Sequence, residues 1–437
     1  MRKTADSRQR TAEKTRRLPA VRCLLSAVLI SASAQAQEPS NPATQQPGQY
    51  IGVASCANSG CHGATTPLQA TRIRQNEYFT WLHSDHHAGA YNILFNNLSA
   101  RIAKNMKLGK KAYEAKLCLD CHSSNIPPAM ISGRIDIEDG IQCETCHGPA
   151  SGWRGEHAQP GWTHAQSVER GMIDLRDTRN RAHTCNACHI GNGDKDVDHD
   201  LIASGHPFLA FELDNYTETM PPHWNPNDTH GVPAWAVGQA MAFRDSMANL
   251  ARHARGEKWP EFSDMSCYNC HHALKSSGWR QERGWPGRPG LPAWSPQRWA
   301  VLRMIVPSSD RAALDDAVAR VASRVARMSP DAASAADDAR RAIEAALPRI
   351  YSRSWSAEDV RPMIIALTAE RDTDVHAAEQ RALSLQTLAT VLTRRDNRLA
   401  AGPLMKAIDA LFAELKDRDD YDPARFGAKL DAVRNAL

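Results

Sequence analysis

The chain has 437 residues, 42% of them hydrophobic and only 6% aromatic, with a formal net charge of +4. Residues 1–36 hold eight of the 53 Lys/Arg and two of the 49 Asp/Glu residues, which leaves 45 basic and 47 acidic residues in the rest of the chain. A chain so close to neutral lacks the basic surface on which nucleic-acid binding depends, so we expect no nucleic-acid partner. The length allows two or three domains. The hydrophobic and aromatic residues are few for a large core built from side chains alone.

The N-terminus has the pattern of a secretory signal peptide. Basic residues lead into the apolar run Cys23–Ile30, and Ala34-Gln35-Ala36 follows it. A charged, an apolar and a small-residue region in this order are typical of an export signal with its cleavage site. The apolar run is too short to span a bilayer, and no later segment is apolar enough. We therefore predict a signal peptide over residues 1–36, no transmembrane segment after its cleavage near Ala36, and a periplasmic mature protein.

Cysteine and histidine share one part of the chain. Ten of the eleven cysteines and seventeen of the eighteen histidines lie between Cys56 and His272, whereas His376 stands alone. The composition changes in a Pro/Gly/Trp-rich stretch of a kind that is typical of linkers. The predicted organisation is a signal peptide (1–36), a Cys/His-rich domain (37–283), a linker (284–296) and a C-terminal domain (297–437).

Four C-x-x-C-H motifs repeat within the Cys/His-rich domain, where composition alone predicts about 0.01 of them. Two thiols at this spacing can add to the two vinyl groups on one edge of a porphyrin, and the next residue can then place its imidazole on the iron. Disulfides and zinc sites also use paired cysteines, but neither requires a histidine after every second cysteine. The predicted haem c attachment residues and proximal ligands are Cys118, Cys121 and His122; Cys143, Cys146 and His147; Cys185, Cys188 and His189; and Cys267, Cys270 and His271.

A fifth motif, "SCANSGCHG", has four residues between its cysteines where the others have two. Cys56 and Cys61 could form a small disulfide loop, or they could attach a haem with His62 as its proximal ligand. The spacer Ala57–Gly60 consists of small and turn-forming residues that suit an outward bulge. Because four regular motifs follow, we predict a fifth haem c here. Five apolar macrocycles would supply much of the missing core, and their propionates would favour a partner with a basic docking surface.

Four stretches of this domain resemble the cytochrome c-554 family. They are "EYFTWLHSDHHAGAYNILF" (77–95), "GIQCETCHGPASGWRGEH" (140–157), "DVDHDLIASGHPFLAFELDNYTETMPPHW" (196–224) and "WPEFSDMSCYNCHHAL" (259–274). Members of this family are periplasmic electron carriers, and the best-known type has four haems, mostly with histidine on both faces of the iron and one of them five-coordinate. The resemblance implies distal iron ligands at His87, His157, His199, His206 and His223.

Other residues compete for the distal positions. His83 and His86 lie beside His87, and any of the three could reach an iron. Methionine ligation by Met220 or Met265 is also possible, but the abundance of histidine favours histidine on both faces of each iron.

The spacing of His199 and His206 makes a separate prediction. The two residues are seven apart, which is two turns of a helix, so a helix here would turn both side chains to the same side. Gly205 and Pro207 would allow a close approach to a porphyrin face and fix the local backbone.

The last third of the chain predicts a bundle of four to six helices. Its apolar residues recur at helical spacing, as in Leu314, Val318 and Val321, and Ser356 has the character of an N-cap. The fold class expected for the whole chain is mainly α, with little regular sheet. A structural cap over the haem domain is the favoured role of the bundle, and a docking module for a redox partner is the alternative.

Two functions fit these features. The first is an electron carrier that passes single electrons through about five haems between redox partner proteins. The second is an oxidoreductase in which one haem keeps an open axial position for a small nitrogen compound. A carrier has no catalytic residues, and the chain contains no C-x-x-C-K variant that would provide a lysine-ligated catalytic haem.

Overall fold

The computed structural model describes residues 48–69, 73–193, 195–224, 231–267, 270–271, 292–395, 402–418 and 420–437. The chain divides into two compact units, Met1–Gln35 and Ala36–Leu437, and all described residues belong to the second. The predicted signal peptide lies outside the described residues, as do residues 284–291 of the predicted linker.

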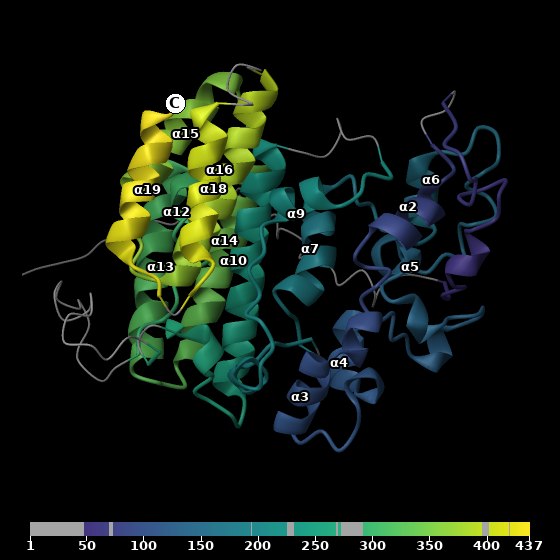
Figure 1. Cartoon of the computed structure of the whole chain (residues 1–437), viewed down its shortest axis with the longest axis horizontal. Coiled ribbons are helices and arrows are strands. Elements are labelled where there is room, and N and C mark those ends of the chain that lie inside the picture. Colours follow the sequence, from purple (N-terminus) through teal and green to yellow (C-terminus); the bar gives the residue numbers. More distant parts are fainter. Residues whose placement is uncertain are drawn as a thin grey trace, which may run out of the picture. The chain divides into compact units, whose positions relative to one another are not determined.

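The described residues are mainly α-helical, which confirms the predicted fold class (Figure 1). They form sixteen α-helices and several short 3-10 helices. The β-structure among them is limited to three isolated bridges, Tyr50–Ile131, Asn192–Lys195 and Met265–Trp294. Their backbone hydrogen bonds are therefore made mostly within helices and turns rather than in a sheet.

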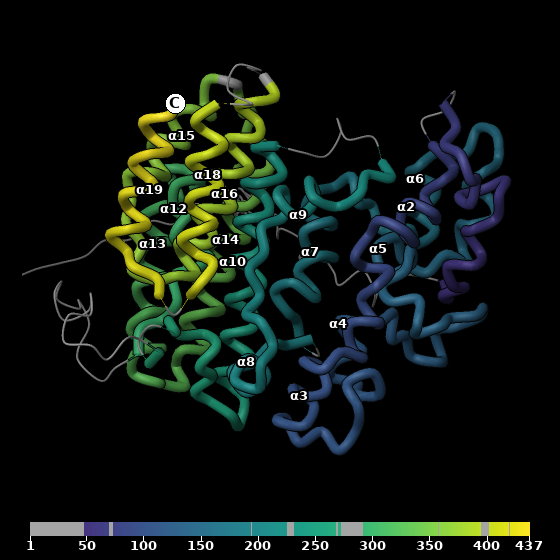
Figure 2. The backbone as a smooth tube through the Cα atoms, in the orientation of Figure 1, coloured from purple at the N-terminus to yellow at the C-terminus, as the bar shows by residue number. Residues whose placement is uncertain are grey.

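Short helices joined by long loops build the Cys/His-rich part of the chain, as the backbone trace in Figure 2 shows. The helices α4, α5 and α7 each end at the histidine of a C-x-x-C-H motif. The α-helices of this part are α2 (Glu77–Ser84), α3 (Asn97–Asn105), α4 (Lys116–His122), α5 (Cys143–His147), α6 (His164–Glu169), α7 (Thr178–His189), α8 (His199–Ala203) and α9 (Leu213–Thr219). Its 3-10 helices are η1 (Val53–Ser55), η2 (Asn92–Phe95), η3 (Ala112–Glu114), η4 (Pro128–Met130), η5 (Ile137–Asp139) and η7 (Phe262–Asp264).

Acidic side chains start the helices that carry or follow the third regular motif. Asp177 accepts a hydrogen bond from the first turn of α7, and Asp198 does the same for α8 at 2.9 Å. Glu212 accepts from the backbone N–H groups of Asp214 and Asn215 at the start of α9. Because an N-cap satisfies N–H groups that have no partner within the helix, these residues fix where each short helix begins.

The long helix α10 (Val232–Arg255) packs along α14 and also contacts α7 and α9. It is buried on nearly all sides, as expected for a helix whose apolar residues are not confined to one stripe, with Trp235 and Phe243 among its fully buried side chains. At Gly238 an added Cβ would lie 2.7 Å from Cβ of Leu213, so the glycine allows α9 to approach.

The C-terminal helices lie side by side as a bundle, coloured green to yellow in Figure 1. Seven are described, so the expected number of four to six was too low; α12 is a single turn, too short to show a periodic pattern. Ser356 caps α15 in a capping box with Asp359, as predicted. The seven helices are α12 (Leu302–Ile305), α13 (Ser308–Ala326), α14 (Ala332–Tyr351), α15 (Ala357–Ala369), α16 (Val375–Arg395), α18 (Pro403–Leu415) and α19 (Pro423–Asn435).

One hydrophobic core joins α10 to the C-terminal helices. It contains Trp235 and Phe243 of α10 together with Leu314, Ile343 and Leu388 from the bundle. The core therefore extends across the stretch that the composition marks as a linker, and the division into domains at 284–296 stays a prediction.

Candidate functional site

The ten cysteines of the five motifs are free thiols, and no pair of them forms a disulfide. The alternative of a Cys56–Cys61 disulfide therefore has no counterpart in the structure. In the part of the chain that the structure describes, no three His, Cys, Asp or Glu side chains come together as a metal site.

The first motif, with its longer spacer, makes the same backbone hydrogen bond between its histidine and its first cysteine as a regular motif does. In the last motif the backbone N–H of His271 donates to the carbonyl of Cys267 at 2.8 Å, and in the first the N–H of His62 donates to the carbonyl of Cys56 at 3.2 Å. The longer spacer turns back on itself, with the N–H of Cys61 donating to the carbonyl of Asn58 at 2.8 Å. The extra residues thus leave the relation between the first cysteine and the histidine unchanged.

Four pairs of imidazole rings face each other at nearly the same spacing. Each pair joins one predicted proximal ligand to one predicted distal ligand from another part of the chain. The ring centroids are 6.1 Å apart for His62 and His157, 6.2 Å for His87 and His189, and 6.4 Å both for His122 and His206 and for His199 and His271.

This spacing fits an iron held between two histidines. A metal–imidazole bond is about 2 Å long and the ring centroid lies about 1 Å behind the nitrogen, so two imidazoles on one iron have centroids about 6 Å apart. The interplanar angles range from 8° to 85°, which is compatible with such a site because each ring can rotate about its metal–nitrogen axis.

Five of these eight histidines, and also His223, have an oxygen atom within hydrogen-bond distance of Nδ1. Two partners are carboxylates, Glu77 for His62 and Asp85 for His87, each at 2.9 Å. The other oxygen partners are backbone carbonyls: Ala90 for His122 at 3.1 Å, Arg154 for His157 at 2.5 Å, Pro207 for His206 at 2.8 Å and Pro221 for His223 at 3.4 Å. A bond of this kind fixes the tautomer and ring orientation of a metal-bound histidine and leaves Nε2 for the metal.

The pKa values of the imidazole rings depend on burial and on these hydrogen bonds. Burial lowers the pKa of His122 and His206, and it lowers the pKa of His189 to about 4. Hydrogen bonds to their carboxylates raise the pKa of His62 and His87 instead. A ligand imidazole must be neutral on the nitrogen that binds iron, so burial favours that state in His122, His206 and His189.

The remaining predicted proximal ligand, His147, and the remaining predicted distal ligand, His223, are arranged differently. Burial lowers the pKa of His147 to about 4, and the nearby charge of His223 contributes to that shift. Among the described residues, however, no imidazole faces His147 at the spacing of the other four pairs. The two residues are therefore neighbours without the close ring-to-ring geometry.

The structure distinguishes His87 from His83 and His86, the two other candidates for this distal position. His83 and His86 are exposed, and the His83 ring lies against Phe79 with centroids 5.9 Å apart. His87 is half-buried and faces His189. Of the three, only His87 is in a position to share an iron with a motif histidine.

The expected helix through His199 and His206 is not formed. The helix α8 ends at Ala203, and Gly205 turns the chain with φ of +118°. His206 therefore leaves the direction of α8 and faces His122, while His199 faces His271. Gly205 prevents the helix from continuing to His206, because a residue with positive φ ends a helix.

Thiols of different motifs lie next to one another. The neighbouring thiol of Cys143 lowers the pKa of Cys56, and that of Cys121 lowers the pKa of Cys188 to about 6 against the effect of burial. Burial raises the pKa of Cys185 to about 11 and that of Cys146 to about 12, with the charge of Cys185 adding to the second shift. Each contact brings together the attachment edges of two predicted haem sites.

Sequence reasoning missed His376, which lies on α16 in the cysteine-free part of the chain. Its Nε2 atom is 3.3 Å from Sγ of Cys267, and its ring stacks on Phe208 with centroids 3.8 Å apart. The signal that could have found it is its isolation, since every other histidine lies within the Cys/His-rich segment.

One family of known proteins matches part of the chain. Residues 55–148 match the family described as cytochrome c554 and c-prime. This segment resembles the cytochrome c-554 family. The match supports a c-type cytochrome that uses haem c in electron transfer. No curated protein and no solved structure matches the chain significantly.

The search for membrane-spanning helices covered only the residues that the structure describes. Within them, no helix combines the length and the apolar character needed to cross a bilayer.

Proposed function

We propose that the protein is a periplasmic electron carrier that passes single electrons through five covalently attached haem c groups. Haem c, when bound, supplies an iron that alternates between ferric and ferrous states. The observation that carries the proposal is the set of four histidine pairs at 6.1–6.4 Å, each of which joins a motif histidine to a histidine from elsewhere in the chain.

The cysteines of the five motifs would tether the cofactors, and the motif histidines would bind the irons from one side. In four sites His157, His206, His87 and His199 would bind from the other side and keep water and small ligands away from the metal. Glu77 and Asp85 would hold two of these rings in place through Nδ1 and increase their basicity. These are the properties of closed electron-transfer sites rather than of substrate-binding sites.

Neighbouring cofactors would lie edge to edge. The contacts of Cys56 with Cys143 and of Cys121 with Cys188 support two close pairs of sites, and the interaction of Cys146 with Cys185 supports a link between those pairs. Short separations favour fast electron transfer, so this order of contacts supports one continuous path through four of the five sites.

The predicted signal peptide supports export, and the resemblance to periplasmic carriers supports the compartment. The partners would be a donor and an acceptor protein that dock near exposed attachment edges, such as those at Cys61 and Cys270. In this proposal residues 37–283 hold the haems, and residues 297–437 cover the last of them through His376.

A second function is favoured by one observation. Among the described residues, no imidazole lies opposite His147 at the spacing of the other pairs, and its neighbour His223 has the longest Nδ1 hydrogen bond of the set, at 3.4 Å. A haem at this site could keep an open axial position and act on a small nitrogen compound, which would make the protein an oxidoreductase.

The test combines haem stoichiometry with ligand binding. We expect pyridine haemochrome and intact mass to give five haems per chain, and a Cys56→Ala/Cys61→Ala variant to give four. A colourless protein would overturn the proposal, and a variant with an unchanged haem count would remove the fifth site. Carbon monoxide should leave all ferrous haems unchanged if the protein is only a carrier, whereas binding that a His147→Ala variant loses would favour the oxidoreductase.

A further inference from the structure

A cavity of about 100 Å³ lies next to the predicted haem ligand His189. Phe208 and Leu209 form part of its wall, and Gln297 and Arg298 enter it from the segment that precedes α12. Neither Gln297 nor Arg298 belongs to a haem motif, so the functional assignment made above leaves both unexplained.

Arg298 is a buried cation without an anionic partner. Its side chain is 7% exposed. Nη1 donates to the carbonyl of Phe211 at 2.6 Å and Nη2 to that of Leu209 at 3.5 Å, and no described carboxylate lies within ion-pair distance. Burial of a guanidinium without a counter-ion is unfavourable. We therefore expect an anion to bind beside Arg298.

The acidic groups closest to Arg298 have other partners. Glu212 accepts hydrogen bonds from Thr387 and from the start of α9, and burial together with the charge of Asp214 raises its pKa to about 8. Glu379 is paired with both His376 and Arg418. The charges of both carboxylates act on Arg298, but neither carboxylate forms an ion pair with it.

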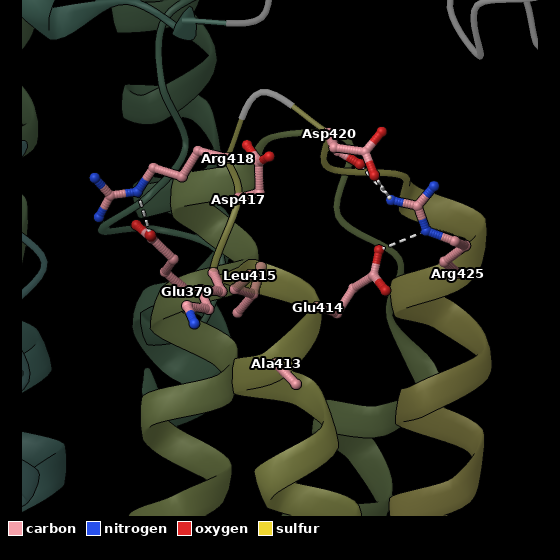
Figure 3. A pocket seen from close by; sticks show the side chains of 9 residues that line it. Glu379, Ala413, Glu414, Leu415, Asp417, Arg418, Asp420 and Arg425 are labelled. Carbon is pink, nitrogen blue, oxygen red and sulfur yellow. Dashed lines mark hydrogen bonds and ion pairs between the residues drawn. The ribbon is translucent and has the colours of Figure 1, made fainter.

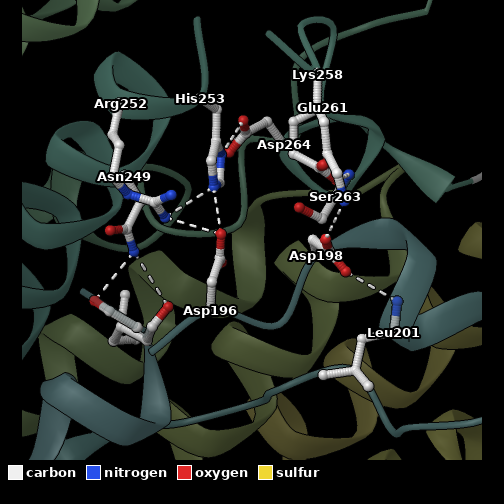
Figure 4. Close-up of polar contacts among 12 residues, drawn as sticks. Asp196, Asp198, Leu201, Asn249, Arg252, His253, Lys258, Glu261, Ser263 and Asp264 are labelled. Atoms are coloured by element: carbon white, nitrogen blue, oxygen red, sulfur yellow. Dashed lines mark hydrogen bonds and ion pairs between the residues drawn. The ribbon is translucent and has the colours of Figure 1, made fainter. Parts of the chain in front are cut away.

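The acidic residues of the cavity wall are also paired. Asp196 accepts from Arg252 and from Nε2 of His253, and Asp264 accepts from Nδ1 of the same histidine, each at 2.8 Å (Figure 4). With His253 protonated, these two carboxylates and two cations balance each other. These two carboxylates are therefore not available to Arg298, which forms no ion pair among the described residues.

Gln297 provides a second donor without a partner. Its side chain is 6% exposed and lines the same cavity, and its Nε2 atom has no hydrogen-bond partner in the described structure. A buried amide N–H group without an acceptor destabilises the folded state. An acceptor in the cavity would satisfy Gln297 and Arg298 together.

We propose that Arg298 and Gln297 form a carboxylate-binding site for a propionate of the haem attached at Cys185 and Cys188. His189 lines the cavity, so the cofactor that this histidine binds is the nearest source of a carboxylate. A guanidinium and an amide N–H group together match the two oxygens of a carboxylate. The inference rests on the proposed haem function, and it makes the segment before the bundle part of one haem site. A free carboxylate such as acetate has the same chemistry and is the other possible source.

The test uses the purified holoprotein and its Arg298→Gln variant. Neutralising the propionate stabilises the ferrous state, which carries one negative charge more than the ferric state. Loss of Arg298 should therefore raise the ferric-to-ferrous ratio of one haem about tenfold at a fixed potential, which lowers its midpoint by about 59 mV. The propionate bending band of one haem should shift in the resonance Raman spectrum. Arg298→Lys should restore most of the potential, and Gln297→Leu should cause a smaller shift in the same direction.

Arg303→Gln is the matched control, since Arg303 pairs with Asp315 on the surface. Counting the haems distinguishes the proposed function from the propionate site. A chain without haem refutes the proposed function. A fully loaded Arg298→Gln variant with unchanged potentials and unchanged Raman bands refutes the propionate site. Acetate that stabilises the wild type but not Arg298→Gln, without any change in potential, would assign the site to a free carboxylate and overturn the proposal. If Arg298→Gln does not accumulate, Gln297→Leu decides the question by the same readouts.

Discussion

The Sγ atom of Cys267 lies 3.3 Å from Nε2 of His376, a residue 109 positions later in the chain. The opposite nitrogen of His376 is 2.9 Å from Glu379, and Glu379 also accepts a hydrogen bond from Arg418 at 2.6 Å (Figure 3). A chain of polar contacts thus runs from the last haem motif to the end of α18. It ties the C-terminal bundle to the predicted haem site and supports its role as a cap.

Replacing His376 with alanine should destabilise the protein without removing a haem. The substitution leaves Glu379, which is 8% exposed, with one cation instead of two, and it opens a cavity beside Phe208. We expect a loss of about 2–4 kcal/mol in the free energy of unfolding, measured by urea denaturation. Haem stoichiometry should not change, because Cys267 and Cys270 make the covalent bonds.

His86→Ala is the control for this experiment, since the His86 side chain is exposed. Equal stability of the two variants would contradict a structural role for the contact between His376 and Cys267.

Substitution of a distal histidine should open one iron. His157 faces His62 at 6.1 Å, so His157→Ala should leave that iron without its sixth ligand. We expect a new high-spin ferric signal in the electron paramagnetic resonance spectrum and binding of carbon monoxide by about one haem in five.

His164→Ala tests whether any nearby histidine would have the same effect. The Nε2 atom of His164 is 2.9 Å from Asp174, so its nitrogen is already occupied. We expect this variant to keep the wild-type spectrum; a high-spin signal in both variants, or in neither, would refute the assignment of His157.

Gly140 connects the backbone to a distal ligand. It has φ of +64°, and an added Cβ would lie 2.6 Å from the carbonyl oxygen of His87 and 2.8 Å from that of Ala88. Gly140→Ala should therefore displace the His87 loop, destabilise the fold by about 1–3 kcal/mol and weaken the low-spin signal of the haem at His189. Visible absorption and denaturation measure these two effects.

Gly109→Ala is the matched control, because Gly109 has φ of +66° and nothing within 4 Å of its added Cβ. It carries only the conformational cost of about 1 kcal/mol. If both substitutions cost the same and leave the spectrum unchanged, the contact with His87 has no effect on coordination.

The cluster around His253 predicts a pH dependence of stability. Burial opposes the charge of His253, but hydrogen bonds to Asp196 and Asp264 outweigh burial and raise its pKa to about 10. The unfolded value is about 6.5. Because the folded pKa is the higher one, the stabilisation is fully present below pH ~6.5 and is lost as the pH rises towards ~10.

Urea denaturation at pH 6 and pH 10 should show a loss of a few kcal/mol for the wild type. His253→Gln should be less stable at pH 6 and should lack most of this dependence. Parallel curves for the two proteins would assign the pH dependence to other groups.

The sequence by itself determined the attachment chemistry, because the groups involved are contiguous. A haem accepts two thiols on one porphyrin edge and a histidine on its iron at a fixed local spacing, so each C-x-x-C-H motif predicts an attachment site without knowledge of the fold. Local rules also fixed the N-cap at Ser356 and the mainly helical class.

Only the tertiary structure decided which histidines meet. His199 and His206 are seven residues apart, yet they face His271 and His122 because Gly205 turns the chain between them. His376 and Arg298 lie outside every motif, and they reach Cys267 and the cavity beside His189 only through packing of the helical core. The physical reason is that axial ligation and charge pairing join side chains far apart in sequence, so they depend on the three-dimensional arrangement of the chain and not on local spacing.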